Sequence, residues 1–370
     1  MKNYRWVGNL YPDWFRRPAS PLERTWRWPL ALKAAQRFVK QRLGITIPDN
    51  YYIPKDGRLY LRTDYYRLLM QWGTLAFLFK FIRRLSKEKQ NFESEVLPAY
   101  KALLSSWRQE SQTFKDMNTA EIWQWMKSIM EVDVAYTVKI VYVGTYGFLF
   151  DFLLAQFYKR FVKDEPDGYH ALLAGFPNRT FEMNAELFRL SRIDKENQSF
   201  GVGFPDFLTN FGLEKSDWEL ALPVLGEYPP AIMHLIDSYR IHPELDPTLR
   251  LEKAKAKRKE KYMYALGHLK YAFITKPVFR WIVRWAQAYV PLRETRQHFI
   301  GAATYFLRQG LKLLGERLGV GQEKIFFLEK SEIDEAVRGG INLLNLKQVS
   351  DGRYNLWLSQ KEHIPNEDRK

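Results

Sequence analysis

The stretch from Val132 to Tyr158, VDVAYTVKIVYVGTYGFLFDFLLAQFY, decides the fold class of this chain. Its apolar residues recur at helical spacing, and Asp133, Lys139 and Asp151 interrupt it. The longest uncharged run, residues 140–150, is about half of the roughly 20 residues that a membrane-spanning helix needs. The stretch therefore predicts a buried helix in an all-α core, and a membrane-spanning helix is the alternative.

Helical spacing continues on both sides of this stretch. The helices that we expect cover residues 66–85, 92–110, 120 onward, about 132–162, 252–272 and 279–319, the last with an interruption near Pro291. A turn at Lys55-Asp56-Gly57, between two β-prone runs, predicts a small β-hairpin near residues 51–62. The predicted fold class is therefore mainly α, a large helical domain with one small hairpin and an extended N-terminal arm.

The two ends differ from this helical body. Residues 1–30 hold prolines at positions 12, 18, 21 and 29, which argue against a long helix. We expect an extended arm here, anchored on another surface by its aromatic residues: Trp6, Trp14, Phe15, Trp26 and Trp28. Residues 31–345 are then the helical domain, and residues 346–370 a polar C-terminal tail.

Two short elements are expected near the C-terminus. The apolar run Lys324–Leu328 is interpreted as a strand, and Ser331–Val337 as a short helix. Ser331 and Asp334 have the spacing of a capping box, with Asp in the usual place of Glu.

Composition narrows the possible chemistry. The 370 residues include 57 Lys and Arg against 42 Asp and Glu, and this surplus of +15 favours an anionic partner. The absence of cysteine excludes disulfides, thiolate metal sites and a cysteine nucleophile. No apolar leader follows Met1-Lys2-Asn3, so no secretory signal is expected and the predicted location is the cytoplasm.

Several catalytic motifs are missing from the sequence. It contains no GxxxxGK[ST] or GxGxxG loop, no HExxH, no GxSxG and no paired-histidine spacing. No metal site is therefore predicted. His298 lies two residues from Arg296 and is able to titrate, but no nucleophile partner is evident from the sequence.

The segment Leu172–Asn184, LLAGFPNRTFEMN, is the first candidate site. Its Gly-x-Pro-Asn pattern ends one helix and starts another, which Asn178 or Thr180 can cap. One interpretation is a capped helix start and nothing more. The other is a helix N-terminus that faces a cleft and attracts an anion. The substrate-binding residues would then be Asn178, Arg179, Thr180, Glu182 and Asn184.

A second candidate site comprises Arg293, Glu294 and Arg296. Guanidinium groups three residues apart share a helical face and are able to bind a phosphate or carboxylate. A salt-bridged interior helix is the alternative. The basic run Lys253–Lys259, KAKAKRK, is interpreted as a solvated helix face, with nucleic-acid contact as its alternative.

Taken in order, several segments resemble the central helical region of the phosphoenolpyruvate synthase and pyruvate phosphate dikinase-like phosphotransferases. These segments are Arg17–Glu23, Gly57–Tyr60, Leu173–Asn184, Arg293–Arg296 and Leu307–Leu328. The resemblance spans roughly residues 17–345. Within this family, the chain resembles a split subunit of the phenylphosphate synthase type and the substrate domain of rifampicin phosphotransferase-like enzymes.

The resemblance implies that this chain supplies one of three cooperating parts. In that family an ATP-grasp part makes the phosphoryl donor, a swivelling part carries a phosphorylated histidine, and the central region holds or supports the acceptor. No residue here matches the ATP-grasp or swivelling-histidine motifs. ATP and Mg²⁺ are therefore expected on a partner subunit, the phosphohistidine on another, and no cofactor on this chain alone. The expected function is an acceptor-binding or scaffold subunit without a complete active site of its own, whose acceptor is an aromatic or other apolar alcohol.

One departure from the family pattern concerns a histidine. Where relatives carry a GHRG..E stretch, this chain reads Gly212-Leu213-Glu214, so that Leu213 replaces the histidine. The resemblance therefore implies that the acceptor site lacks this group or works differently.

Two other hypotheses stay open. The chain could be a non-catalytic helical protein that binds nucleic acid, a lipid headgroup or another anionic partner through a basic surface. It could also be an autonomous enzyme with an unrecognised site. Under the phosphotransferase-subunit hypothesis, nucleic acid is not an expected partner. An acidic partner subunit is then the counterpart of the +15 charge.

Overall fold

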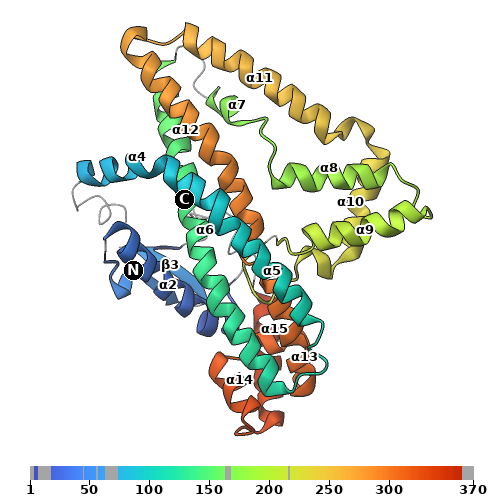
Figure 1. The fold of residues 1–370 in the computed structure, drawn as a ribbon. Helices are drawn as coiled ribbons and strands as arrows, with labels where there is room; N and C mark the ends of the chain where they lie inside the picture. The colour runs from blue at the N-terminus through green and yellow to red at the C-terminus, as the bar shows by residue number, and fades with distance from the viewer. Residues whose placement is uncertain are drawn as a thin grey trace. The chain divides into compact units, whose positions relative to one another are not determined.

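The computed structural model describes residues 4–6, 18–44, 46–55, 57–62, 74–162, 168–215 and 217–360. Most of them are helical (Figure 1), which confirms the predicted mainly-α class. The chain forms two compact units. Unit 1 contains the residues up to Lys139, Lys215–Val224 and the residues from Gly301, and unit 2 contains Ile140–Glu214 and Leu225–Ile300.

Unit 1 holds a small antiparallel sheet in the order β1–β3–β2. β2 (Tyr52–Lys55) and β3 (Arg58–Arg62) form the hairpin predicted near residues 51–62, and β1 (Tyr4–Trp6) adds a third strand. Gly57 turns the hairpin with a φ of 74°, and a Cβ there would lie 2.7 Å from the Cβ of Pro18. Glycine is therefore required at this turn.

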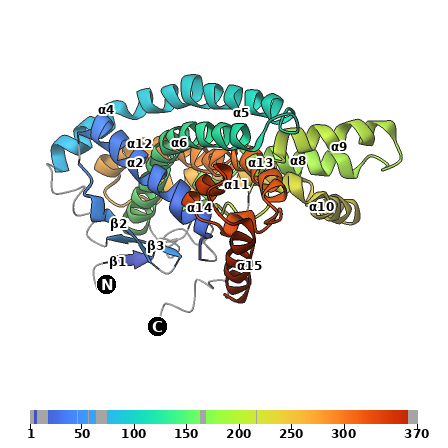
Figure 2. The ribbon, with the colours of Figure 1, turned by 90° about the horizontal axis from the view of Figure 1, so that it is seen from below.

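One face of the sheet packs on α2 (Trp28–Leu43), as Figure 2 shows. Leu59 and Leu61 of β3 share a buried cluster with Trp28, and Leu32 and Val39 of the same helix pack against it. The alternating pattern of β3, in which every second residue is buried, is the pattern of a strand with one covered face.

Two π-helical turns in unit 1 each accompany a proline. η1 (Glu23–Arg27) continues into α2 with Pro29 in its first turn, and η3 (Phe92–Val96) continues into α5 (Leu97–Ser111) with Pro98 in its first turn. Proline lacks the N–H that closes an i→i−4 bond, and a widened turn accommodates this loss.

The expectation of an extended arm over residues 1–30 is therefore corrected in its second half. Residues 21–30 are helical, because their prolines lie where a helix tolerates them. Trp26 and Trp28 are buried, as expected of anchors. Trp14, Phe15 and the side chain of Trp6 lie outside the described residues.

The rest of unit 1 is helical. Its remaining elements are η2 (Asp49–Tyr51), α4 (Thr74–Asn91), α6 (Thr119–Phe161) as far as Lys139, α13 (Thr304–Arg317), η6 (Ile325–Phe327), α14 (Lys330–Val337) and α15 (Leu343–Ser359). α4 covers the second half of the helix expected over residues 66–85, and residues 63–73 lie outside the described part.

Two predictions for the C-terminal region were wrong, and the expected polar tail contains a helix. Lys324–Leu328 is a 3₁₀ turn (η6) rather than a strand, since a short buried apolar run suits either. The capping box of α14 is formed by Glu329 and Glu332 instead of Ser331 and Asp334. Much of the expected polar tail is α15, whose Trp357 is buried and donates a hydrogen bond of 2.7 Å to the carbonyl of Pro18.

Unit 2 is also helical. Besides the second part of α6 it contains α7 (Tyr169–Leu173), α8 (Arg179–Ser191), α9 (Gln198–Phe211), η4 (Leu225–Glu227), α10 (Pro229–Ile241), η5 (Pro243–Leu245), α11 (Pro247–Gly267) and α12 (Ala272–Phe299). A buried apolar cluster joins α8, α9 and α10. α12 continues through Pro291, where an interruption was expected, and ends at Phe299.

α6 is long and apolar enough to cross a membrane, judged by length and composition alone. In unit 2 it also buries a stripe at four-residue spacing, Tyr146, Phe150, Leu154 and Tyr158, as the core helix of a globular unit does. Phe148 and Phe152 on its other side are exposed. The expectation that this helix does not span a membrane stays a prediction.

Candidate functional site

The first predicted site lies at the start of α8 in unit 2. Asn178 has an extended backbone, and its side chain accepts a hydrogen bond of 2.8 Å from the N–H of Phe181, so it is the N-cap. Glu182 and Arg179 form an ion pair of 3.0 Å across the first turn, and Asn184 is partly buried farther along the helix. The capped helix start is therefore present, Arg179 contacts Asn210 of α9, and Thr180 contacts α12.

Thr180 contacts His298, and His298 contacts Glu214. The hydroxyl of Thr180 lies 3.0 Å from Nε2 of His298, and Nδ1 of the same ring lies 2.8 Å from Oε2 of Glu214. The side chains of His298 and Glu214 are each only 11% exposed, whereas Thr180 is exposed. The three groups form a hydroxyl–imidazole–carboxylate chain that solvent reaches from the threonine end.

The carboxylate of Glu214 is fixed by its backbone and by a second partner. The backbone carbonyl of Glu214 accepts a hydrogen bond of 2.8 Å from the N–H of Leu225. Just before Glu214, the carbonyl of Gly212 accepts a hydrogen bond from the N–H of Gly226. The two glycines lie so close together that a Cβ on Gly226 would be 3.0 Å from the carbonyl oxygen of Gly212. Arg179 places Nε 3.5 Å from the other carboxylate oxygen of Glu214. The carboxylate therefore faces His298 in one defined orientation.

This arrangement suits proton transfer at one atom. When Nδ1–H of His298 donates to Glu214, the Nε2 atom is left as an acceptor. A hydroxyl at the position of the Thr180 hydroxyl then donates its proton toward Nε2. A carboxylate that holds an imidazole in this tautomer is the arrangement by which histidine acts as a general base.

The two arginines of the second predicted site, Arg293 and Arg296, face α6 rather than α8. Arg293 forms an ion pair of 2.9 Å with Asp151 of α6 and another of 3.2 Å with Glu294, and its guanidinium lies 5.1 Å from the ring centre of Phe148. Arg296 is 1% exposed, and its side chain lies where a Cβ on Gly144 of α6 would be.

The two predicted sites are therefore not joined through the arginines. Residues five positions apart on a helix point about 140° away from each other. α12 accordingly presents Arg293 to α6 and His298 to α8. The salt-bridged interpretation describes Arg293 and Glu294 as they stand in the structure.

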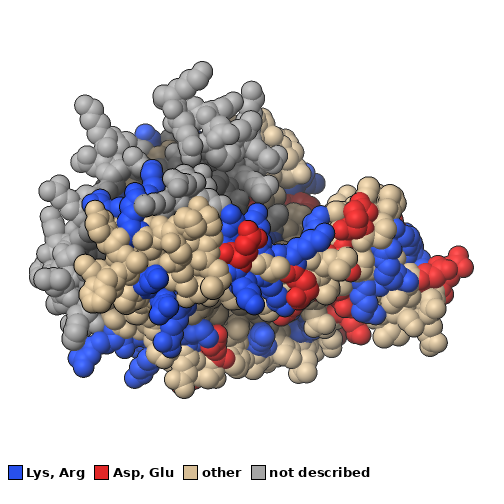
Figure 3. Space-filling view, turned by 90° about the horizontal axis from the view of Figure 1, so that it is seen from above, with Lys and Arg blue, Asp and Glu red and all other residues tan. Residues whose placement is uncertain are grey.

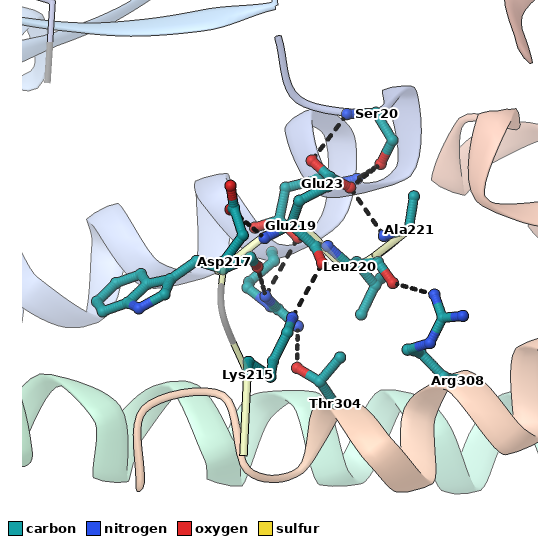
Figure 4. A network of polar contacts seen from close by, with 11 residues as sticks. Ser20, Glu23, Lys215, Asp217, Glu219, Leu220, Ala221, Thr304 and Arg308 are labelled. Carbon is teal, nitrogen blue, oxygen red and sulfur yellow. Dashed lines mark hydrogen bonds and ion pairs between the residues drawn. The ribbon is translucent and has the colours of Figure 1, made fainter. Parts of the chain in front are cut away.

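A separate network of buried charged groups lies within unit 1 (Figure 4). The carboxylate of Glu219 accepts hydrogen bonds from the N–H and the hydroxyl of Ser20, at 3.0 and 2.6 Å, and a third of 2.9 Å from the N–H of Ala221. Glu23 accepts from the N–H of Leu220 at 3.2 Å. The Nζ of Lys215 donates to the carbonyl of Glu219 at 2.9 Å.

Two arginines complete this network. Arg27 pairs with Glu23 at 3.2 Å and donates to the carbonyl of Trp218 and the hydroxyl of Thr304, at 2.7 and 2.8 Å. Arg308 donates to the carbonyl of Leu220 at 2.8 Å (Figure 4). These bonds attach the segment Lys215–Val224 to Ser20 and η1 and to α13.

Burial shifts the titration of several of these groups. It raises the pKa of Glu23 to about 7, an effect that Arg27 opposes. Burial, and after it the charge of Arg27, lowers the pKa of Lys215 to about 7. The pKa of Asp133 is raised by burial, and that of Tyr100, which donates to Asp133, is raised by burial and by the carboxylate charge. Such shifts occur at functional sites and also in structural ion-pair networks.

Sequence reasoning missed the partners of both sites. His298 was noted without a partner, and Glu214 was noted only as a neighbour of Leu213 in the segment that departs from the family pattern. That departure was the available signal, since polar residues there proved to be largely buried. No spacing rule connects Glu214 to His298, because only the fold places the segment after α9 beside the end of α12.

Cavities and metal ligands add little to this description. A depression of about 530 Å³ in unit 1 includes none of the predicted site residues. It is lined by Thr113, Asp116, Met117, Glu121, Gln124, Trp125 and Ser128. Within the described ranges, no three His, Asp or Glu side chains gather as a set of metal ligands.

Comparison with known proteins finds a similarity to a phosphotransferase domain in the middle of the chain. Residues 139–294 match the family model described as the rifampicin phosphotransferase fourth domain. This match includes Thr180, Glu214 and Arg293, and it ends before Arg296 and His298. Chondramide synthase cmdD from Chondromyces crocatus is 26% identical in an alignment of 215 residues that covers 48% of this chain and 5% of that protein. The chain thus spans about a twentieth of the length of this curated relative.

Proposed function

We propose that this chain is the acceptor-binding or scaffold subunit of an ATP-dependent dikinase-like phosphotransferase. The ATP-grasp and phosphohistidine parts, together with ATP and Mg²⁺, belong to partner subunits in the cytoplasm. The observation that supports this most is the match of residues 139–294 to a rifampicin phosphotransferase domain. A likeness to phenylphosphate synthase-type subunits, with an aromatic or other apolar alcohol as acceptor, is the finer form of the same proposal.

His298 is the group that we assign to the chemistry of the acceptor. Its Nε2 atom faces the exposed hydroxyl of Thr180, and Glu214 orients the ring from the other side. An acceptor alcohol that takes the place of the Thr180 hydroxyl donates its hydrogen bond to Nε2. His298 thereby supplies an imidazole in a region where Leu213 replaces the histidine of relatives.

Transfer of the phosphoryl group to the acceptor forms one bond to phosphorus and breaks another. The acceptor oxygen forms a bond to the phosphorus of the partner's phosphohistidine while its proton moves to Nε2 of His298. The phosphorus–nitrogen bond breaks, and its electron pair returns to the partner's imidazole. Positioning and proton removal are then the contributions of this chain, as expected for a reaction that needs little covalent chemistry from the protein.

The other predicted residues have supporting roles in this proposal. Asn178 and Glu182 form the first turn of α8, and Arg179 holds the carboxylate of Glu214. Arg293 is 21% exposed beside Asp151, so that it is able to meet the anionic side of an incoming group. Arg296 is buried against α6 and supports the helix that carries His298.

Purification of the chain from its native source, with its bound proteins, tests the proposal. We expect ATP-grasp and phosphohistidine proteins to co-purify. Without acceptor, the complex should form AMP only once, as its histidine becomes phosphorylated, and an alcohol acceptor should allow repeated turnovers. If neither protein co-purifies, or if the partners phosphorylate the same acceptor equally well without this chain, the proposal fails.

The alternative of a nucleic-acid-binding protein makes a different prediction. On the face drawn in Figure 3, Lys and Arg are interspersed with Asp, Glu and uncharged residues rather than gathered in one unbroken stripe. If this alternative holds, binding to DNA falls steeply with salt, and no alcohol or partner protein raises the melting temperature.

A further inference from the structure

In unit 2, α11 and α12 meet at a turn (Figure 1). Exposed apolar side chains gather at this turn. Phe273 is 96% exposed, Tyr271 77%, Ile274 68% and Met263 62%. Val278 and Trp281 continue the exposed apolar surface along α12. Single exposed apolar residues are ordinary, but a group of them on one turn marks a surface that contacts something else.

The turn that carries these side chains is a fixed structure. Leu269 pairs with Val162 as a β-bridge, and the N–H of Lys270 donates to the carbonyl of Phe161 at 2.8 Å. The buried hydroxyl of Thr275 donates to the carbonyl of Lys270 at 2.8 Å. Tyr271 adopts a left-handed conformation with a φ of 53°, which is unfavourable for a bulky residue. Such local strain is more often found where the residue has a task than in a free loop.

The same two helices carry most of the excess positive charge. Between positions 253 and 284 there are ten Lys and Arg residues and one acidic residue, Glu260. The net charge of this segment is therefore +9, against +15 for the whole chain. Lys270 and Arg280 are exposed beside the apolar side chains, and Lys276 lies half-buried between them.

We infer that this end of unit 2 binds the surface of an anionic phospholipid membrane. Phe273, Ile274 and Met263 enter the boundary between headgroups and acyl chains, and the lysines contact the anionic headgroups. Apolar side chains bordered by Lys and Arg are the combination that holds proteins at membrane surfaces. This inference is independent of the proposed phosphotransferase function.

Two features favour a lipid surface over other anionic partners. Nucleic acid rewards aromatic stacking and positive charge, but offers no place for the exposed aliphatic side chains of Ile274 and Met263. Protein interfaces place residues of both charge signs around an apolar centre, whereas a single acidic residue among ten basic ones fits a surface of uniform negative charge.

Sedimentation of the whole chain with vesicles tests this inference. We expect binding to phosphatidylcholine vesicles that contain about 30% phosphatidylglycerol, and weak or no binding to pure phosphatidylcholine. The double variant F273S/I274S should bind at least about tenfold more weakly. Lys270→Ala and Lys276→Ala should each reduce binding roughly fivefold, and salt should weaken binding by the wild-type chain.

Matched variants separate this surface from general stickiness. Ile241 is 73% exposed at the end of α10, so Ile241→Ser removes a similar side chain elsewhere in unit 2 and should leave vesicle binding unchanged. Lys347→Ala serves the same purpose for charge. Vesicle binding that survives F273S/I274S overturns the inference, as does binding to a DNA oligonucleotide without binding to anionic vesicles.

Discussion

Nδ1 of His298 lies 2.8 Å from a carboxylate oxygen of Glu214, and the two side chains are shielded from solvent to the same extent. Because the opposite ring nitrogen faces the hydroxyl of Thr180, this pair converts a lone histidine into an oriented proton acceptor. The pairing depends on the fold of unit 2, since the end of α12 supplies one residue and the segment after α9 supplies the other.

His298 and Glu214 should therefore differ in how much activity they control. In the complex with its phosphoryl-donor partners, His298→Asn should lower kcat by about 100-fold or more, since it removes the general base. Glu214→Gln leaves the imidazole in place but weakens its orientation, so a loss of about tenfold is expected. Glu186→Gln is the matched control, because Glu186 lies on the same helix as Thr180 and pairs with Arg189 rather than Arg179. Acceptor-dependent formation of AMP is the measurement.

Thr180→Val separates two roles for the threonine. If the acceptor alcohol replaces the threonine hydroxyl at Nε2 of His298, this variant keeps most of its activity. Mass spectrometry of the wild-type chain after turnover should then find no phosphate on Thr180. An inactive valine variant together with phosphorylated Thr180 would mean that the threonine itself is the acceptor, contrary to our assignment.

Local signals in the sequence predicted the helices and the start of the site. The periodicity of residues 132–158 lies within α6, and the Gly-x-Pro-Asn pattern predicted the cap that Asn178 forms. The turn at Gly57 predicted the hairpin. In each case the residues that decide the structure are neighbours in the sequence, so that propensity and spacing are sufficient.

Long-range pairing could not be predicted in the same way. Trp357 donates to Pro18 across nearly the whole chain, and α15 is ordered by such contacts although its composition suggested a polar tail. Glu219 is buried against Ser20 for a similar reason, since a glutamate is expected on the surface unless distant donors satisfy it. The second half of the expected N-terminal arm shows the opposite error. An extended segment was predicted from the number of its prolines, but Pro29 lies in the first turn of α2, where a helix tolerates proline.

The buried carboxyl of Glu23 should make stability depend on pH. Its pKa is about 7 in the folded chain against 4.5 ordinarily, so that between these values the folded state retains a proton that the unfolded state has lost. Stability from this group is complete below pH 4.5 and is lost as the pH rises to 7, by about 3 kcal/mol. Urea unfolding at pH 5 and 7 should show this fall in wild type and a smaller one in Glu23→Gln. Glu95→Gln, at an exposed position, should leave the fall unchanged.

Lys215 should act in the opposite direction at higher pH. Its pKa is about 7 in the folded chain against 10.5 ordinarily, so that in this window the unfolded state binds the additional proton. The contribution of Lys215 to stability therefore rises as the pH increases from 7 to 10.5. Lys215→Met should remove this rise from a urea-unfolding series, whereas Lys347→Met at an exposed site should keep it. Equal pH profiles for wild type and Lys215→Met would show that Lys215 is not buried as described.

The packing of α6 on α12 should tolerate no side chain at Gly147. A Cβ there would lie 2.9 Å from the backbone carbonyl oxygen of Tyr289 and 3.0 Å from the Cβ of Arg293. Because both contacts are with rigid parts of α12, Gly147→Ala should force the helices apart and lower the free energy of unfolding by about 1–3 kcal/mol.

Gly201 in α9 provides the matched control for Gly147. No atom lies within 4 Å of its added Cβ, so Gly201→Ala should instead stabilise the chain by about 0.5–1 kcal/mol through helix propensity. Urea unfolding of both variants measures the difference. If the urea midpoint of Gly147→Ala is unchanged, α6 and α12 lie farther apart in solution than described. The close approach at Gly147 then does not fix Arg293 beside Asp151.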